Sequence, residues 1–217
     1  YLNELSQNNT NWYDELFRNG VSTTHNLSIS GGGEKYTYYT SLAYTRNAGL
    51  LKNNNYDRYN ITANLTMTPN QKVRLDFGAS MSYQDSKSPA LSTFDPFQYA
   101  YFANPYEKPY NTDGSYCTDE TYYTLGKYNY ETTSRKKVPD SGFNMREMNE
   151  TSSRTKNINT TVRAGIDYSI ISKLRFVGLA SYTYSTNRLK EIYGDGTKAA
   201  LDNRMSVDYL SQKEYAS

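Results

Sequence analysis

A strict two-residue alternation from Val73 to Tyr83 constrains the fold of this chain more than any other feature. Apolar side chains occupy the odd positions of this segment, and charged residues, serine or glycine occupy the even ones. Successive side chains of a β-strand point to opposite faces, whereas a helix repeats roughly every 3.6 residues. The segment therefore predicts a strand with one apolar face and one polar face.

Five further segments carry the same period. They are Thr24–Ser30, Tyr36–Thr45, Tyr59–Thr68, Lys156–Tyr168 and Leu174–Tyr184. The clearer strands run for about ten or eleven residues, the length with which a tilted strand crosses a bilayer and about twice that of a usual soluble strand. The one helical pattern is Asn11–Gly20, whose Asn start and acidic first turn predict one or two turns of helix.

The connections between the predicted strands alternate in length. The short ones are Gly31–Lys35, Thr68–Lys72 and Ser169–Lys173, and the long ones are Asn47–Asp57, Gln84–Arg154 and the segment from Thr186 onward. In an up-and-down order, all short connections lie on one side of the sheet and all long ones on the other. Outer-membrane barrels combine short periplasmic turns with long extracellular loops in this way.

The strand charges fall on the less apolar phase. These charges are Arg74, Asp76, Arg163, Asp167 and Arg175. A membrane barrel keeps its lipid face free of charge, while the face that lines the lumen is polar. A soluble antiparallel β-sandwich also alternates, but it needs neither strands of this length nor loops that are long on one side only.

Composition supports strands and excludes several classes. The chain has 24 Tyr and 7 Phe against a single Trp, with a mean hydropathy of −0.85, which suits half-buried strands better than disorder. No stretch reaches the roughly 18 apolar residues of a membrane helix. The 24 basic and 22 acidic residues are scattered without long runs, which leaves no nucleic-acid footprint. Cys117 stands alone, so no disulfide framework is expected.

Candidate catalytic and metal-binding residues are few. Asp113, Asp119 and Glu120 share a polar loop, where we interpret them as solvated charges. His25 is the only histidine and precedes a predicted strand, which favours an interfacial or loop role. We interpret Gly31–Gly33 as a tight turn, since a phosphate-binding loop has a different length and place. We predict no enzyme, no catalytic residue, no cofactor and no metal ligand, although Ca²⁺ in the acidic loops stays open.

An aromatic segment of the longest loop is the richest candidate for ligand binding. Its candidate residues are Phe97, Tyr99, Tyr101, Phe102, Tyr106 and Tyr110. Flat rings near Asn and Asp side chains can stack on sugars or grip peptides, and the competing interpretation is that they fold the loop or pack against a partner. Asp113–Gly114 between Tyr110 and Tyr116 predicts a hairpin tip. Tyr44, Tyr83, Tyr182 and Tyr184 are expected to form an aromatic girdle at the membrane interface.

These patterns divide the chain into five parts. Residues 1–22 are expected to form an extracellular loop with a short helical turn, 23–84 four barrel strands, 85–154 a long extracellular loop, 155–185 two barrel strands, and 186–217 the start of a further extracellular loop. Known single-chain barrels begin at about eight strands, so six strands cannot close one. The predicted fold class is all-β, as part of a large antiparallel transmembrane β-barrel.

Several short segments of the sequence resemble those of a known family. Asn11–Arg18, His25–Gly32, Asn47–Leu51, Ala103–Tyr106 and Tyr110–Tyr116 resemble, in order and spacing, the SusC/RagA family of TonB-dependent outer-membrane transporters of the Bacteroidetes. The resemblance extends at least from Asn11 to Tyr116, and the later strands agree in pattern only.

The resemblance implies a parent barrel of about 22 strands with a plug domain, to which this chain supplies about strands two to seven. It further implies a location in the bacterial outer membrane, a SusD-like surface lipoprotein as partner, TonB as the energy source, and import of oligosaccharides or oligopeptides. The alternative is a secreted or surface β-sandwich that binds glycans and folds without detergent.

Overall fold

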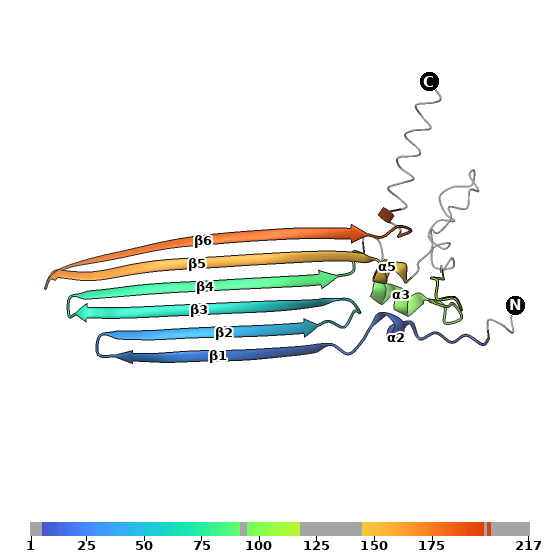
Figure 1. The fold of residues 1–217 in the computed structure, drawn as a ribbon, viewed down its shortest axis with the longest axis horizontal. Coiled ribbons are helices and arrows are strands. Elements are labelled where there is room, and N and C mark those ends of the chain that lie inside the picture. The colour runs from blue at the N-terminus through green and yellow to red at the C-terminus, as the bar shows by residue number, and fades with distance from the viewer. Residues whose placement is uncertain (1–5, 92–94, 118–144, 198, 201–217) are drawn as a thin grey trace, which may run out of the picture.

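The computed structural model describes residues 6–91, 95–117, 145–197 and 199–200. Its strands are β1 (Val21–Gly33), β2 (Tyr36–Ala48), β3 (Asn55–Asn70), β4 (Val73–Ser88), β5 (Thr151–Ile171) and β6 (Leu174–Tyr193). They form one antiparallel sheet in which the spatial order is the chain order (Figure 1). The predicted six-stranded, up-and-down arrangement is confirmed.

The register sorts the side chains into two faces, because residues paired across antiparallel strands point the same way. One paired row runs through Leu27, Leu42, Ile61, Met81, Thr160 and Tyr184, and the next through Ile29, Thr40, Ala63, Ala79, Val162 and Tyr182. We call the face that carries these rows the apolar face. The opposite, polar face carries rows such as Ser28, Ser41, Thr62, Ser80, Thr161 and Thr183.

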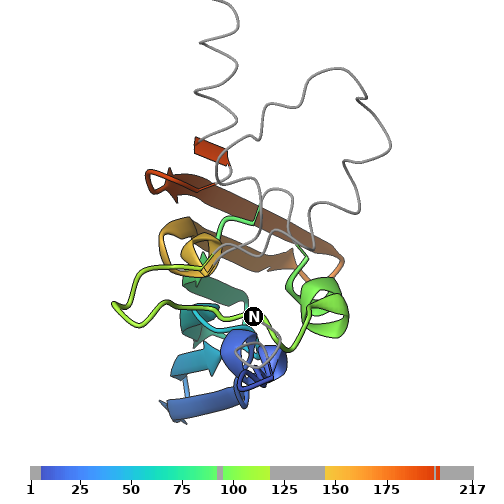
Figure 2. The same cartoon turned by 90° about the vertical axis from the view of Figure 1, so that its right-hand side faces the viewer.

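Among the described residues, short helices lie at the end of the sheet where the long connections are. They are α2 (Trp12–Leu16), α3 (Pro96–Phe102) and α5 (Arg146–Asn149). Figure 2 looks at the molecule from this end and shows them in front of the strand ends. None of the helices in the described residues is long and apolar enough to cross a membrane. The opposite end of the sheet carries only the short turns (Figure 1).

The strands are longer than their sequence pattern predicts, and most of the extension lies at the helix end. β4 continues to Ser88, β5 begins at Thr151, and β6 runs to Tyr193, beyond the predicted limits at 84, 155 and 185. In the extensions of β4 and β5 both alternating phases are polar, so the hydrophobic period fades while the backbone ladder continues. The short turns shrink correspondingly, and the first consists of Glu34 and Lys35 between β1 and β2.

Two local predictions in β1 are wrong. Gly31–Gly33 belong to the strand and not to the turn, and His25 lies within the strand and not before it. Gly31 pairs with Tyr38, and a Cβ at Gly31 would lie 2.6 Å from the Tyr38 hydroxyl oxygen. The glycine therefore leaves room for an aromatic ring to lie across the neighbouring strand.

The described residues contain one sheet and no second sheet packed on it. Buried hydrophobic residues gather at the helix end instead, in a cluster that we call the loop cluster: Trp12, Leu16, Tyr99, Ala100, Met145 and Met148. Large side chains on the apolar face stay exposed within this chain, such as Leu27 at 65% and Phe77 at 43%. A β-sandwich, which needs two packed sheets, is therefore absent from the described residues.

Candidate functional site

The helix end of the sheet holds the candidate site, and local capping signals explain two of its helices. The Asn11 side chain accepts a hydrogen bond from the backbone N–H of Tyr13 at the start of α2. Asp95 accepts from the backbone N–H groups of Phe97 and Gln98 at the start of α3, where Pro96 occupies the first turn. Such caps satisfy N–H groups that have no partner within the helix. The Asp95–Pro96 pair is the sequence signal by which α3 could have been predicted.

Long-range contacts join these helices into the loop cluster. The rings of Trp12 and Tyr99 meet edge to face with centroids 5.1 Å apart. The indole N–H of Trp12 donates to the carbonyl of Asn104 at 3.0 Å, and the backbone N–H of Thr10 donates to the carbonyl of Pro105 at 2.8 Å. The segment before β1 is thereby fastened to the long loop after β4.

The six predicted ligand residues separate into two groups. Tyr99 is 0% exposed, so it stabilises the loop cluster and offers no ring surface to a ligand. The other five rings are exposed to different extents: Phe97 59%, Tyr101 73%, Phe102 66%, Tyr106 50% and Tyr110 37%. Sequence reasoning could not separate these groups, because burial here depends on segments distant in the chain.

The exposed rings do not form one continuous surface. Tyr101 and Phe102 pack against each other at 4.9 Å, edge to face. Phe97 instead packs on Phe17, with ring centroids 4.6 Å apart, and Tyr110 packs on Tyr116, with ring centroids 5.7 Å apart. Four of the five exposed candidate rings therefore belong to three separate ring pairs, and Tyr106 is half-exposed beside them in the sequence.

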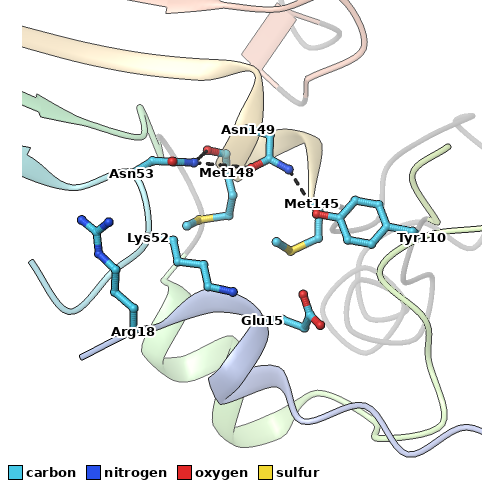
Figure 3. Close-up of a pocket in the computed structure, with 8 residues that line it drawn as sticks. All are labelled: Glu15, Arg18, Lys52, Asn53, Tyr110, Met145, Met148 and Asn149. Atoms are coloured by element: carbon cyan, nitrogen blue, oxygen red, sulfur yellow. Dashed lines mark hydrogen bonds between the residues drawn. The ribbon is translucent and has the colours of Figure 1, made fainter. Parts of the chain in front are cut away.

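A pocket of about 360 Å³ opens between α2, the β2–β3 connection and α5, and Figure 3 shows the side chains around it. Its lining residues are Glu15, Arg18, Lys52, Asn53, Tyr110, Met145, Met148 and Asn149. Of these, only Tyr110 was predicted. The others come from segments that are distant in the sequence and share no local pattern.

Hydrogen bonds hold the polar side of this pocket. The Asn149 side-chain amide donates to the Tyr110 hydroxyl at 3.2 Å, and the Asn53 amide donates to the carbonyl of Met148 at 3.0 Å (Figure 3). The Lys52 ammonium donates to the carbonyl of Asp14 at 2.6 Å. The lining contains one carboxylate, two cations and two thioethers, and both cations, Arg18 and Lys52, donate to backbone carbonyls of the chain itself.

The predicted hairpin tip at Asp113–Gly114 is confirmed. Tyr110 and Tyr116 form an antiparallel bridge, and Gly114 has a positive φ of 82°. Hydrogen bonds from the hydroxyl and the backbone N–H of Ser115 hold the pKa of the Asp113 carboxyl below its ordinary value. The Asp113 carboxylate therefore stabilises the turn through its hydrogen bonds with Ser115.

The remaining titratable candidates do not assemble into a reactive site within the described residues. Asp119 and Glu120 lie outside that part of the chain. Burial raises the pKa of the Cys117 thiol, which disfavours a reactive thiolate. No group of three or more His, Cys, Asp or Glu side chains that could hold a metal ion occurs among the residues that the structure describes.

The polar face of the sheet carries the strand charges as hydrogen-bonded pairs. Arg74 binds Asp76 at 3.0 Å, and Arg175 binds Asp167 through two hydrogen bonds. Arg163 donates to the Asn64 side chain at 3.3 Å. The predicted segregation of these charges to one face is confirmed, because Arg74 pairs with Asp167 and Gly78 with Arg163 in the register.

Comparison with known proteins gives the same assignment. No protein-family model matches the chain. It is 31% identical over 139 residues to the TonB-dependent receptor SusC of Bacteroides thetaiotaomicron, an alignment that covers 56% of this chain and 14% of SusC. TonB-dependent receptors P26 and P3 of Formosa agariphila are 30% and 32% identical, each over 50% of this chain and over 10% and 12% of their own lengths. The chain is thus similar to SusC and to other TonB-dependent receptors over about half of its length.

Two solved structures show the fold that the sheet belongs to. The RagAB peptide transporter superposes with a TM-score of 0.66 at 14% identity, over 87% of this chain and 21% of that chain. The RagAB peptide importer in its closed-closed state gives 0.63 at 16% identity, over 86% and 21%. The matched proteins are several times longer than the aligned part of this chain, which covers between 10% and 21% of their lengths. The six strands form part of a large antiparallel barrel, as predicted, and the relatives are named as receptors, transporters or importers.

Proposed function

We propose that this chain forms part of the wall of an outer-membrane importer of oligopeptides or oligosaccharides, which works with a SusD-like lipoprotein and with TonB. One observation carries the proposal: the sheet has an apolar face without charges over its central rows and a polar face opposite. The apolar rows fit lipid, and the polar rows fit a water-filled lumen. The similarity to TonB-dependent receptors and to the RagAB transporter supports TonB dependence and a location in the outer membrane.

The orientation follows from the unequal ends of the sheet. Outer-membrane barrels place short turns in the periplasm and long connections outside the cell. We therefore place the two-residue turns, such as Glu34–Lys35, in the periplasm and the loop cluster at the extracellular surface. The predicted extracellular loops at 1–22, 85–154 and 186–217 belong to this proposal.

The polar face suits a neutral polymer with many hydrogen-bonding groups. It carries an abundance of side-chain amides: Asn26, Asn60, Asn64, Asn157, Asn159 and Asn187. Amides both donate and accept hydrogen bonds, which matches peptide backbones and sugar hydroxyls alike. The exposed rings of Tyr101 and Phe102 then offer a stacking surface at the entrance, for substrate or for the lipoprotein.

A matched pair of substitutions tests the placement in the membrane. Ala79→Arg puts a charge on the apolar face in a central row, and Ser80→Arg puts the same charge on the polar face next to it. An arginine on the lipid face near the bilayer midplane costs about 2–4 kcal/mol. In the full-length protein we expect Ala79→Arg to reduce the folded amount in the outer-membrane fraction, whereas Ser80→Arg keeps it. Equal yields of the two variants would refute the proposal.

Growth experiments test the substrate class. A strain that lacks the full-length gene should lose growth on one polymer class, peptides or oligosaccharides, and keep growth on the corresponding monomers. Loss of the lipoprotein gene or of TonB should give the same phenotype. Undiminished growth on both classes would contradict the import role while leaving the barrel assignment intact.

A further inference from the structure

Charged residues appear on the apolar face only at its helix end, directly beyond a row of rings. That aromatic row consists of His25, Tyr44, Tyr59 and Tyr83, whose neighbouring ring centroids lie 6.4, 4.9 and 6.2 Å apart. The next row of the same face contains Arg46, Asp57, Asp85, Lys156 and Arg188. The row after that contains Lys87, Arg154 and Lys190 on three adjacent strands.

Positive charge accumulates on the β4–β6 half of these rows. Five cations, Lys87, Arg154, Lys156, Arg188 and Lys190, face one carboxylate, that of Asp85. Arg154 binds Asp85 through two hydrogen bonds of 2.7 and 2.5 Å, and the Lys156 ammonium lies 3.9 Å from the same carboxylate. On the β2–β3 half, by contrast, Arg46 is matched by Asp57 in the neighbouring position.

The remaining cations have no counter-charge in the part of the chain that the structure describes. Lys87, Arg188 and Lys190 are exposed and take part in no ion pair there. Lys87 and Lys190 both lie directly opposite Arg154, and like charges at directly opposed positions of a sheet destabilise it. A bound anion would remove this repulsion.

The position of the cations along the membrane normal indicates which anion they meet. Each row lies two residues beyond the previous one, so the cationic rows stand about 7 and 14 Å beyond the rings along the strand, and less in depth because barrel strands tilt. Tyrosine rings on the lipid face mark the level of the headgroups. The cations therefore reach the headgroups of the leaflet at the helix end of the sheet, where lipid phosphates lie.

We propose that Lys87, Arg154, Lys156, Arg188 and Lys190 form a cationic patch that binds the phosphate of an anionic glycolipid in the outer leaflet. Arg154, whose Nε and Nη2 groups bind Asp85, can offer its remaining N–H groups to a phosphate oxygen, and the lysines add point charges at its two sides. The inference rests on the proposed function, because it requires the apolar face to contact the outer membrane. The patch fixes the barrel height in the membrane and attracts a defined shell of lipid.

Lipid titration of the full-length protein tests the patch. The protein is extracted in detergent, freed of bound lipid, and titrated with phosphorylated lipid A or with its dephosphorylated form, while native mass spectrometry counts the adducts. Each Lys or Arg near an anionic surface contributes a factor of about five to binding. We expect Lys87→Gln with Lys190→Gln to weaken binding of phosphorylated lipid A about 30-fold, and to leave the weaker binding of the dephosphorylated form unchanged.

Two matched variants serve as controls. Arg58→Gln with Arg163→Gln removes two cations from the polar face and should leave lipid binding unchanged. Lys87→Arg with Lys190→Arg keeps the charge and should retain the affinity, which separates charge from any loss of folding. The heat-dependent mobility shift of folded barrels on gels verifies the fold of each variant.

Several results would overturn the inference. Equal affinity for both lipid forms, or an equal loss in the polar-face variant, would show that the patch does not recognise phosphate. If Lys87→Gln with Lys190→Gln left lipid binding unchanged but abolished co-purification of the lipoprotein, a protein and not a lipid would occupy the patch. Failure of the proposed function looks different, because the unsubstituted protein would then be missing from the outer-membrane fraction.

Discussion

The sheet and the loop cluster are stabilised in opposite ways. In the sheet, a continuous backbone ladder joins six strands that follow one another in the chain, and large apolar side chains such as Leu27 remain exposed within this chain. In the loop cluster, Trp12, Tyr99 and Met148 come from three distant segments and are almost fully buried. The sheet therefore leaves its apolar face to be covered by other surroundings, whereas the loop cluster has a small buried core of its own.

This contrast assigns different tasks to the two regions. A sheet with one apolar and one polar face can separate lipid from water along its whole length. A cluster held by burial and caps can keep loops in place at the end of that sheet. Damage to one region should consequently leave the other intact, and substitutions can test that independence.

The largest effect is expected from emptying the loop cluster. Tyr99→Ala removes a fully buried ring, and loss of a buried aromatic side chain costs about 3–5 kcal/mol. Hydrogen exchange measured by mass spectrometry on the full-length protein should show lost protection in α2 and α5 and full protection in β4. Tyr101→Ala, at a position that is 73% exposed, is the control and should change neither. Deprotection of β4 would show that the two regions fold as one unit.

A smaller effect is expected from crowding the sheet. Gly31→Val places side-chain atoms where the Tyr38 ring lies, and overpacking of this kind costs about 1–3 kcal/mol. The thermal midpoint of the barrel should fall, while protection in the loop cluster stays unchanged. Ser30→Val, on the opposite face of the same strand, serves as the matched control. A Gly31→Val barrel as stable as the control would mean that the ring has other positions available.

Removing a single helix cap should have a milder effect. Asp95→Ala deletes the acceptor for the N–H groups of Phe97 and Gln98, and loss of such a cap costs about 1 kcal/mol. Exchange should accelerate in α3 alone. Asp95→Asn keeps the acceptor and should restore most of the protection, so equal exchange in the two variants would argue against the cap.

The smallest effect is expected from acid at the 110–116 hairpin. The pKa of Asp113 is lowered by the bonds from Ser115, so its contribution is present above the pKa of the unfolded chain and is lost as pH falls through the folded value. Protection of the Ser115 amide, corrected for intrinsic exchange rates, should decline over that acidic range. In Asp113→Asn the same amide should show no pH dependence. A decline shared by both proteins would assign the effect to another group.

The sequence predicted the two regions with unequal success. Alternations such as that of Val73–Tyr83 are local, so the number of strands and their faces followed from them, and the order followed from the lengths of the connections; all three were confirmed. Strand ends were missed, because in stretches such as the start of β5 both phases are polar while the ladder continues. For the loop cluster, the sequence left open whether the aromatic rings bind a ligand or fold the loop, because burial of Tyr99 depends on Trp12, far away in the chain.

The two-faced sheet is the central claim, and lipid contact along β4 tests it most directly. Single cysteines at positions 79 to 82 of the full-length protein, in a Cys117→Ser background, are labelled with a fluorophore in a lipid bilayer. Lipids that carry a quencher should quench the labels at Ala79 and Met81 strongly and those at Ser80 and Ser82 weakly, since the two pairs lie on opposite faces. Equal quenching at all four positions would contradict the account.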